Sequence, residues 1–587
     1  MEEMKFAFYG RQAIIRSRGT IPQTSAEITK TDLFKKYTSD FLENLRKRES
    51  PLLEVFPKNV RKGKQDEVML DLLQRLAEMT KEEINMRFPR FSDFFRDTYL
   101  LNQFVETLYN YWRSFERFLV CYSDQGMEMP LDKKPYRTFN ETVELLNHLV
   151  RKAYRDISEN ITGDHPRIYR QVAAGCQVGI IAAKKDWPCP APYSQLKGIP
   201  FIRQVLIEPP LILDPPMNSR SGEFKKVDSN PLKGINMDSG EWLCYPAKVC
   251  DMVVHIFFHF RFMGLGTSLA NLFELASDQD LQRKPDAVYA FGVPPDALKK
   301  YGKPPTVFFD DEKNGLLVAA VPGTDEFGYF GYLKKMILTL HNIAAMKKGR
   351  LPVHGAMVRI ILKNGKAANV ILWGDTGAGK SESIEAFRVL GDQYIRDMTI
   401  IFDDMGSLKT KEGKVIAYGT ETGAFVRLDD LHPGFAFGNI DRSIIMSPQK
   451  TNARVVIPIT TLQEVSEGHP VDFLLYANNY ENVDEKHPYL EFFKSAEEAI
   501  GVFRYGARMA KGTTGDEKGI VNSYFANIFG PAQYKEMHEK LAGRYFRALF
   551  EAKVKVGQLR TMLGIQGYET KGPESAAKAI FEAIGKS

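Results

Sequence analysis

The chain has 587 residues, which is enough for two to three domains of ordinary size. Hydrophobic residues make up 44% and charged residues 26%, both close to the averages of globular proteins, so a disordered, collagen-like or coiled-coil chain is not indicated. Lysine and arginine exceed aspartate and glutamate by 79 − 73 = 6, without a charged block, and therefore no nucleic-acid partner is indicated.

The five cysteines include no CxxC pair, which argues against a disulfide framework and against a cysteine zinc site. The N-terminal residues carry acidic side chains and no apolar stretch of signal length, and no run of 18 apolar residues occurs. We expect a cytoplasmic protein with no membrane span.

Residues 32–150 have a helical pattern. In residues 67–79, apolar side chains recur mostly at intervals of three and four positions. Residues 91–122 continue the pattern and are rich in aromatic side chains, which we interpret as the core of a helical bundle rather than a surface for base stacking or a cofactor.

Proline, glycine and serine interrupt residues 188–239, which predicts loops and short strands. His255 and His259 follow, four positions apart, and would share one face of a helix. No glutamate of an HExxH motif lies between them, so we expect two packed histidines rather than a metal pair.

After residue 304 the pattern changes to short apolar strands that alternate with turns and helices. Continuous apolar runs of strand length are typical of a sheet that is covered on both faces, and the fold class is therefore α/β. The predicted strands are TVFFDD, GLLVAAVPG, MVRIIL, ANVILWG, MTIIFDD, ARVVIPI and VDFLLYAN.

Residues 370–387, VILWGDTGAGKSESIEAF, match the phosphate-loop pattern GxxxxGK[ST] between a strand and a helix. The glycines allow successive N–H groups to face one anion, at the positive end of the following helix. Lys380 would contact the β- and γ-phosphates and the Ser381 hydroxyl would coordinate Mg²⁺. The expected nucleotide-binding residues of the loop are Gly374, Asp375, Thr376, Gly377, Ala378, Gly379, Lys380, Ser381 and Glu382.

The strand MTIIF, about 20 residues further on, ends in Asp403 and Asp404. A carboxylate at the end of a strand beside a phosphate loop is positioned to hold a second metal or its bound water. We therefore predict a metal role for these two residues rather than a simple turn.

The loop and the aspartate pair together resemble two related families, HPr kinase/phosphorylase and phosphoenolpyruvate carboxykinase. Further segments in order are similar to the ATP-type carboxykinases alone. These segments are GTDEFGYFGYLKKMILTLHNIAAMKKGRLPVHGAM, ETGAFVRLDDL, KTNARVVIPI, TGDEKGI and NSYFANIFGPAQYKEM, over roughly residues 310–550.

The carboxykinase resemblance implies a metal site made of Lys335, His354 and Asp404. A lysine binds a metal only as the neutral amine, so burial beside a cation and Lys334 would have to lower its pKa. The mixed nitrogen and oxygen ligands suit Mn²⁺, in addition to the Mg²⁺ of the nucleotide.

The resemblance also implies catalytic arginines. Arg454 matches the arginine that bridges the transferred phosphoryl group and the substrate, and Arg427 stands where the family has a phosphate-contacting lysine. Arg220, in MNSRSGEFKK, is the candidate for the substrate carboxylate, with a solvated loop arginine as the alternative. Tyr329 stands near the active-site tyrosine, and residues 506–522 resemble a mobile lid or an ordinary flexible loop.

The chain also departs from the carboxykinase pattern. Its loop begins Gly-Asp-Thr rather than Gly-Leu-Ser and ends GKSE, as in HPr kinases. The base-binding motif GKRISIKDTR has no counterpart in residues 555–572, so ATP is the favoured donor but the base, or pyrophosphate in its place, stays open.

The expected architecture is a helical N-terminal region (1–165), an N-terminal α/β substrate-binding domain (166–305), and a mixed-sheet, carboxykinase-like P-loop domain that binds nucleotide and metal (306–587). The expected function is decarboxylation of oxaloacetate, a small dicarboxylate, with phosphoryl transfer from a nucleoside triphosphate to give phosphoenolpyruvate and CO₂. Two alternatives stay open: a kinase acting on a hydroxyl group, as HPr kinase does, and a non-catalytic nucleotide-sensing regulator. The oligomeric state is not predicted.

Overall fold

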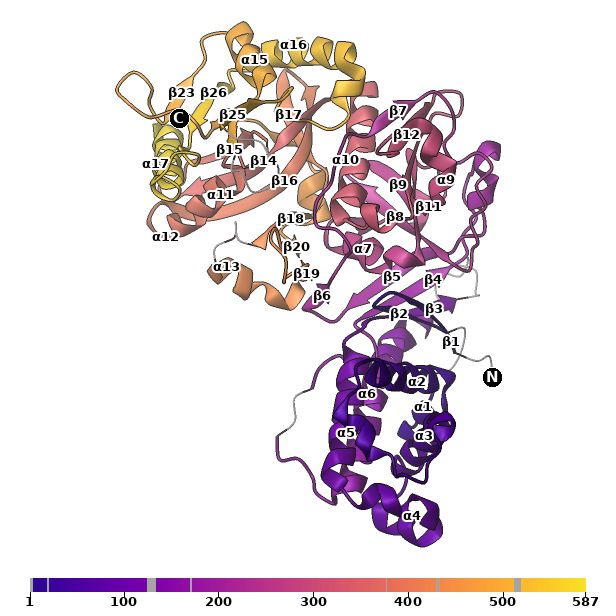
Figure 1. Cartoon of the computed structure of the whole chain (residues 1–587). Coiled ribbons are helices and arrows are strands. Elements are labelled where there is room, and N and C mark those ends of the chain that lie inside the picture. Colours follow the sequence, from indigo (N-terminus) through magenta and orange to yellow (C-terminus); the bar gives the residue numbers. More distant parts are fainter. Residues whose placement is uncertain are drawn as a thin grey trace. The chain divides into compact units, whose positions relative to one another are not determined.

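A computed structural model describes residues 4–17, 21–123, 134–168, 171–375, 377–428, 431, 433–510 and 519–586 (Figure 1). The chain is a mixed α/β protein, as predicted. It divides into two compact units: Met1–Lys185 with Pro200–Glu208, and Asp186–Ile199 with Pro209–Ser587. None of the helices in the described ranges combines the length and apolar character needed to cross a membrane.

Helices make up most of the first unit, as the apolar periodicity predicted. Threonine side chains cap two of them: Thr31 accepts from Phe34 N–H, and Thr80 forms a capping box with Glu83. The helices are α1 (Ser25–Lys30), α2 (Asp32–Lys47), α3 (Gln65–Leu76), α4 (Lys81–Arg87), α5 (Thr98–Arg113) and α6 (Lys134–Thr162).

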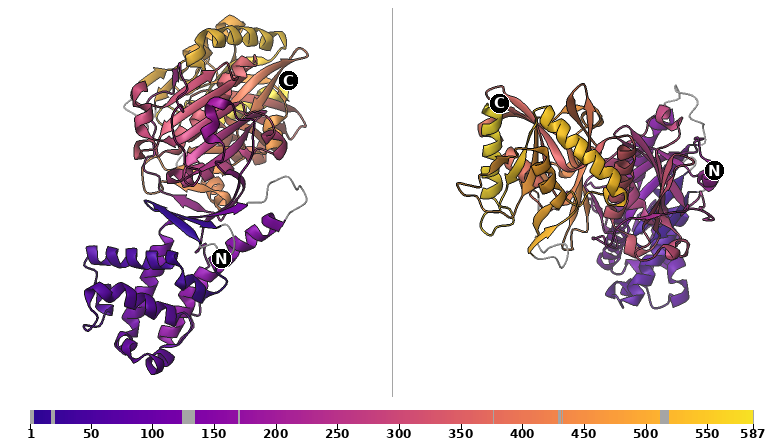
Figure 2. Two further views of the ribbon diagram at one scale, coloured as in Figure 1. Left: turned by 90° about the vertical axis from the view of Figure 1, so that its right-hand side faces the viewer. Right: turned by 90° about the horizontal axis from the view of Figure 1, so that it is seen from above.

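The strands of the first unit form a sheet, and the helices gather on one side of it (Figure 2). In order across the sheet they are β1 (Lys5–Tyr9), β2 (Gln12–Ser17), β3 (Glu116–Ser123), β4 (Val178–Ala183) and β5 (Phe201–Ile207). The helical prediction is therefore wrong for Glu116–Ser123. Its continuous apolar run pairs in parallel with a strand on each side, so that tertiary pairing decides its conformation.

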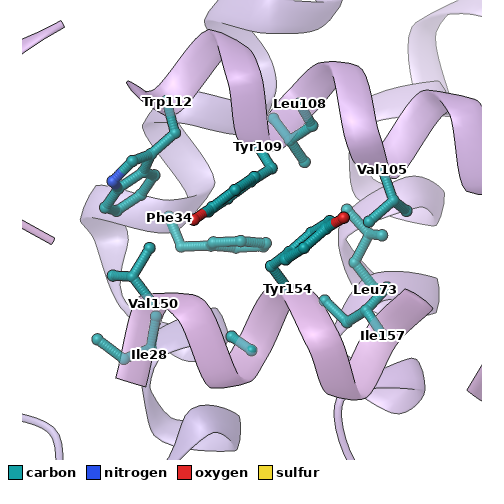
Figure 3. A pocket seen from close by; sticks show the side chains of 11 residues that line it. Ile28, Phe34, Leu73, Val105, Leu108, Tyr109, Trp112, Val150, Tyr154 and Ile157 are labelled. Atoms are coloured by element: carbon teal, nitrogen blue, oxygen red, sulfur yellow. The ribbon is translucent and has the colours of Figure 1, made fainter. Parts of the chain in front are cut away.

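Aromatic side chains form much of the core of the first unit, as predicted for residues 91–122. Phe91, Phe94 and Phe104 are fully buried, whereas Tyr99 is exposed. Five helices, α1, α2, α3, α5 and α6, leave an apolar cavity of about 40 Å³ between them (Figure 3). Tyr109 and Tyr154 border it, with their rings stacked 4.1 Å apart.

The first sheet of the second unit has the strands β8 (Trp242–Val249), β9 (Met252–His259), β11 (Ala287–Val293), β13 (Leu316–Pro322), β12 (Val307–Asp311) and β7 (Lys225–Val227) in this order, with β10 (Glu274–Leu275) beside β8. Short helices α7 (Met263–Ser268), α8 (Asp278–Leu281) and α9 (Pro295–Leu298) connect them. His255 and His259 lie on β9 and not on a helix, which corrects the helical prediction. His255 is a packed histidine, as expected, and its ring meets Trp187 edge to face at 4.8 Å.

The second sheet has the order β21 (His469–Pro470), β17 (Lys414–Gly419), β16 (Ile395–Lys411), β14 (Leu351–Leu362), β15 (Ala367–Trp373), β22 (Phe473–Asn478), β26 (Lys555–Arg560) and β23 (Leu490–Phe492). Its helices are α11 (Lys380–Val389), α12 (Gly391–Tyr394), α14 (Leu462–Ser466), α15 (Ala496–Tyr505), α16 (Lys535–Glu551) and α17 (Lys571–Lys586). Residues of α11 and α17 pack on one face through Leu372 of β15, while Trp373, the next residue, meets Phe503 and Phe546 on the other face. The sheet is covered on both faces, as its apolar strands predicted.

Helix α10 (Phe330–Lys347) contacts strands of both sheets of the second unit. All of its residues are buried except Lys335 and Lys347, so the helix is enclosed by the protein around almost its whole circumference. A third, small sheet contains β18 (Gly423–Arg427), β20 (Arg454–Pro458), β19 (Ile444–Met446) and β6 (Leu211–Leu213), with α13 (Pro433–Gly438) nearby in sequence. A hairpin of β24 (Ala507–Ala510) and β25 (Gly519–Asn522) completes the described elements. All seven strands predicted after residue 304 are present.

Candidate functional site

The phosphate loop lies between β15 and α11, in the predicted order of strand, loop and helix. Gly377 and Gly379 have φ angles of 79° and 104°, which L-amino acids with side chains rarely adopt. A Cβ atom at Gly379 would also lie 2.8 Å from the Thr561 hydroxyl. Two of the predicted loop positions, Thr376 and the Ser381 side chain, lie outside the described residues.

Lys380 is buried at the start of α11. Its ammonium group donates to the carbonyl oxygens of Gly374 at 2.6 Å and Asp375 at 2.9 Å. Ala378 N–H also donates to the Asp375 carbonyl, which closes the turn. The lysine is thus held at the phosphate loop, where its contacts with two carbonyl groups can be exchanged for contacts with phosphate oxygens.

Asp403 and Asp404 lie in the middle of β16 and not at its end, because the strand continues to Lys411. Consecutive residues of a regular strand point to opposite faces. Asp404, however, has a φ of 100°, and both side chains border one cavity. This strained residue brings two adjacent carboxyl groups to the same site, and strain of this kind is concentrated at functional sites.

Two adjacent lysines of α10 have different environments. The Lys334 ammonium lies 2.7 Å from Asp404 Oδ2 and 3.0 Å from Glu421 Oε1. Burial alone would lower the pKa of Lys334, but the two carboxyl groups outweigh it and raise that pKa above its ordinary value. Lys334 therefore stays charged.

Lys335 is the lysine that can lose its proton. Burial, with smaller contributions from the charges of Arg220 and Lys334, lowers its pKa to about 8, although Asp404 acts in the opposite direction. Its Nζ atom lies 4.6 Å from the centre of the Phe529 ring. Near neutral pH, a fraction of Lys335 is therefore the neutral amine that can bind a metal.

His354, on β14, is fully buried beside Asp404. Its Nδ1 atom donates to the carbonyl of Ala526, which can only accept, so Nδ1 carries a proton. The other ring nitrogen, Nε2, lies 3.2 Å from Asp404 Oδ1. A proton or a divalent cation can bridge these two atoms, so His354 and Asp404 are candidates for two ligands of a metal.

The Ala526 carbonyl belongs to a run of residues with left-handed backbone angles. Phe525, Ala526 and Asn527 all have positive φ angles, of 45°, 58° and 58°. Such a run costs free energy in L-amino acids and needs support, which Trp373 gives by donating from its indole nitrogen to the Phe525 carbonyl at 3.2 Å. The segment NSYFANIFG thus forms one wall of the histidine site.

Glu421 is buried beside Lys334. Burial and the charge of Asp404 raise its pKa to about 8, against the attraction of Lys334.

Within the described residues, no group of three or more His, Cys, Asp and Glu side chains is arranged to hold a metal ion. The candidate metal set differs from such groups because one of its members, Lys335, is a lysine.

Two arginines form the other side of the site. Arg427 of β18 and Arg454 of β20 lie directly opposite each other in register. Two guanidinium groups in this arrangement can bind the same anion. Arg454 Nε is buried and has no hydrogen-bond partner among the described residues, and its guanidinium lies 5.5 Å from the centre of the Phe425 ring. This arrangement fits a phosphate or a carboxylate.

Tyr329 and Arg220 lie close to these groups. Burial raises the pKa of the Tyr329 phenol, although Arg454, Lys334 and Arg220 favour its ionised form. Arg220 is partly buried, with its guanidinium 5.0 Å from the Phe224 ring centre, and it donates to the Gly222 carbonyl. Arg220 is near enough to affect Lys335 and Tyr329 electrostatically, but it does not line the cavity.

The predicted residues surround a cavity of about 110 Å³. Those that line it come from α10, the phosphate loop, β16, β18 and β20, or from residues beside them. They are Tyr329, Lys335, Gly377, Lys380, Glu382, Asp403, Asp404, Arg427 and Arg454. The adjoining loop contains Gly374, Asp375, Ala378 and Gly379. His354 contacts Asp404.

Several residues of the site were not predicted. Glu421, Phe425 and Phe529 lie in segments that carry the carboxykinase resemblance, but nothing in their spacing indicates a role. Lys334 was considered only as the neighbour of Lys335. Arg508 lies in the segment 506–522 that resembles a lid, and Asn479 lies in no predicted motif. The contacts of both with the phosphate loop were not predicted, because their partners are more than 100 residues away.

Comparison with models of known protein families and with curated proteins finds no match for this chain.

Proposed function

We propose that the protein is a metal-dependent, phosphoenolpyruvate-carboxykinase-like enzyme with a P-loop carboxykinase-like catalytic domain. It would convert oxaloacetate and a nucleoside triphosphate into phosphoenolpyruvate, CO₂ and nucleoside diphosphate. One observation supports the proposal most: residues from segments far apart in the chain, chosen by their resemblance to that family, surround a single cavity. The cavity combines a phosphate loop, two carboxylates, an amine of lowered pKa and two opposed arginines.

Lys335, His354 and Asp404 would hold a divalent cation, with Mn²⁺ favoured by the mixed ligand set. Such a cation supplies a Lewis acid that polarises a carbonyl oxygen and stabilises an enolate. Lys334 stays protonated and fixes the Asp404 carboxylate at 2.7 Å, while the Ala526 carbonyl keeps His354 Nε2 free to act as a ligand.

The cationic side chains would orient the two substrates. Lys380 would exchange its contacts with two loop carbonyls for contacts with the β- and γ-phosphates. Arg454 and Arg427 would hold the transferred phosphoryl group. The planar guanidinium group of Arg454 would also contact the substrate. Arg220 is the candidate for the substrate carboxylate. Together these residues align the phosphoryl donor with the enolate oxygen that forms when CO₂ leaves, and they spread the charge of the transition state.

A second candidate is a kinase that phosphorylates a hydroxyl group. Burial and the neighbouring Asp404 raise the pKa of Asp403, which borders the cavity together with Lys380. A carboxylate of raised pKa is a stronger base toward a hydroxyl proton. The GKSE ending of the phosphate loop is also that of HPr kinases.

The decisive experiment measures oxaloacetate formation in the reverse direction. Purified protein is supplied with Mn²⁺, phosphoenolpyruvate, bicarbonate and one of ADP, GDP or inorganic phosphate, in an assay coupled to malate dehydrogenase. We expect oxaloacetate with at least one acceptor, and that acceptor identifies the donor as ATP, GTP or pyrophosphate. Phosphate transfer from ATP to a hydroxyl without oxaloacetate would instead favour the kinase, and nucleotide binding without turnover would favour a regulator.

Lys335→Gln and His354→Gln test the site itself. Each is expected to reduce the carboxykinase rate by about 100-fold or more while nucleotide binding is retained. Lys347→Gln is the matched control, because Lys347 lies on the same helix and pairs with Asp310 outside the cavity. Unchanged rates in the Lys335 and His354 variants would overturn the proposal.

A further inference from the structure

The phosphate loop carries a buried carboxylate that is paired with an arginine of β24. Arg508 Nε lies 2.9 Å from Asp375 Oδ2. The Asp375 and Arg508 side chains are only 4% and 17% exposed, so the pair is largely removed from solvent. Asp375 follows the first glycine of the loop directly, and its carbonyl accepts from Lys380.

A second contact holds β24 at the same place. The buried Asn479 side chain donates to the carbonyls of Gly377 in the loop, at 3.0 Å, and of Met509 in β24, at 3.1 Å. Its amide oxygen accepts from Met509 N–H at 2.7 Å. Met509 is the residue after Arg508, so Asn479 fixes the backbone that presents the arginine to the loop.

A carboxylate in a phosphate loop is unfavourable for binding a polyphosphate. Burial alone would raise the pKa of Asp375, but His354, Arg508 and Lys380 lower it below its ordinary value, and the group is ionised. In a poorly solvated site its charge would repel the donor phosphates unless a cation neutralised it. Arg508 donates a hydrogen bond directly to this carboxylate.

We propose that Arg508 is a positioning residue that neutralises Asp375 and thereby sets the affinity of the loop for the phosphoryl donor. The inference rests on the phosphate binding included in the proposed function. It adds a role for a loop carboxylate that stands where the carboxykinases have leucine. Arg508 acts through Asp375 and is not required to touch the donor.

A double-mutant cycle, measured by titration calorimetry with MgATP and with magnesium pyrophosphate, tests the proposal. Arg508→Gln removes the charge that Arg508 brings to the carboxylate, and we expect it to weaken binding of the probe that the wild type binds by about tenfold or more. Asp375→Asn together with Arg508→Gln removes both charges, and we expect affinity within about threefold of the wild type. In the reverse assay, the KM for the nucleotide or phosphate acceptor should rise in Arg508→Gln, with the KM for phosphoenolpyruvate unchanged.

Arg504→Gln is the matched control, because Arg504 lies four residues before Arg508 and pairs with Glu539 instead. We expect it to bind the probe like the wild type. Unfolding temperatures of all variants are recorded, and if Arg508→Gln does not fold, Arg508→Lys and the double variant are compared.

Wild-type affinity in Arg508→Gln would overturn the proposal. So would a double variant as weak as Arg508→Gln, since that result would mean that the arginine has a structural role only. Failure of the wild type to bind either probe would count against the proposed function instead. The two failures are therefore distinguishable.

Discussion

At the scale of single residues, the site depends on buried charges that compensate one another. Lys334 lies between Asp404 and Glu421 and is almost completely buried. Its neighbour Lys335 has a lowered pKa of about 8 and approaches an aromatic ring. One position on the helix therefore supplies a permanent charge and the next supplies an amine that can be neutral.

We predict that Lys334 contributes much more than Lys335 to the free energy of unfolding. Lys334→Met removes the buried ammonium group that Asp404 and Glu421 share and should lower the free energy of unfolding by about 3–5 kcal/mol. Lys335→Met removes a partly desolvated cation and should have a much smaller effect. Denaturant unfolding of both variants measures the difference, and equal losses would contradict the assignment of the permanent charge to Lys334.

His255 makes the second unit sensitive to acid. Burial lowers its pKa to about 3 in the folded protein, whereas a histidine in an unfolded chain titrates near 6.5. Below about pH 6.5 the unfolded chain binds a proton that the folded chain does not. The stability associated with neutral His255 is therefore complete above that pH and is lost as the pH falls toward 3.

We expect His255→Phe, which keeps an aromatic contact with Trp187, to reduce this loss. Between pH 6 and pH 4, the free energy of unfolding should fall by about 1.4 kcal/mol less per pH unit in the variant than in the wild type. Denaturant unfolding at several pH values measures the slope. Identical slopes would show that His255 is not the titrating group.

At the scale of elements, α16 ends in a capping motif that has lysine at the position where glycine is preferred. Lys553 follows the helix with a φ of 59°, and Val554 N–H bonds to the Leu549 carbonyl while Lys553 N–H bonds to that of Phe550. These are the two hydrogen bonds of a Schellman motif, in which glycine is preferred at the left-handed position.

Lys553→Gly should therefore raise the free energy of unfolding by about 0.5–1 kcal/mol. Lys540 provides the control, because it is exposed in the middle of the same helix. Lys540→Gly should lower the free energy of unfolding by about 1 kcal/mol. Thermal unfolding compares the two variants, and a shift of the same sign in both would contradict the explanation.

Two further elements carry strain, and both adjoin the candidate metal ligands His354 and Asp404. Asp404 interrupts the regular alternation of β16, and the left-handed run Phe525–Asn527 presents one carbonyl to His354. The surrounding β14, Trp373 and Phe529 hold these backbones in place. Strain of this kind is expected where a site requires a geometry that a regular strand or turn cannot give.

At the scale of the whole molecule, the chain has two compact units, and the core cluster of the first contains no residue of the second. The candidate site and its loops lie wholly in the second unit. The apolar cavity of about 40 Å³ lies wholly in the first. A change in one unit should therefore be distinguishable from a change in the other.

Calorimetry is expected to resolve two unfolding transitions that respond to different changes. Ala153→Leu partly fills the cavity of the first unit and should stabilise that transition by about 1 kcal/mol. MgATP at about 100 times its dissociation constant should stabilise the other by about 2.7 kcal/mol. A response of a single transition to both changes would show that the units unfold together.

Local signals in the sequence were sufficient for much of the second unit. The seven apolar strands and the order of strand, glycine-rich loop and helix at β15 and α11 were predicted correctly, because strand length, glycine spacing and helix periodicity are properties of neighbouring residues. The same reasoning failed at Glu116–Ser123, where pairing with β2 and β4 makes an apolar run a strand.

The sequence by itself therefore determined seven strands of the second unit, the glycine-rich loop between β15 and α11, and the set of candidate residues. Only the tertiary structure decided which lysine is permanently charged, that Asp403 and Asp404 share a cavity, and that Arg508 pairs with Asp375. Each of these depends on burial or on a contact between residues more than 50 positions apart, or on a backbone angle that its neighbours hold. Such interactions leave no periodic signal along a single chain, because their free energy depends on the distance and desolvation that folding creates.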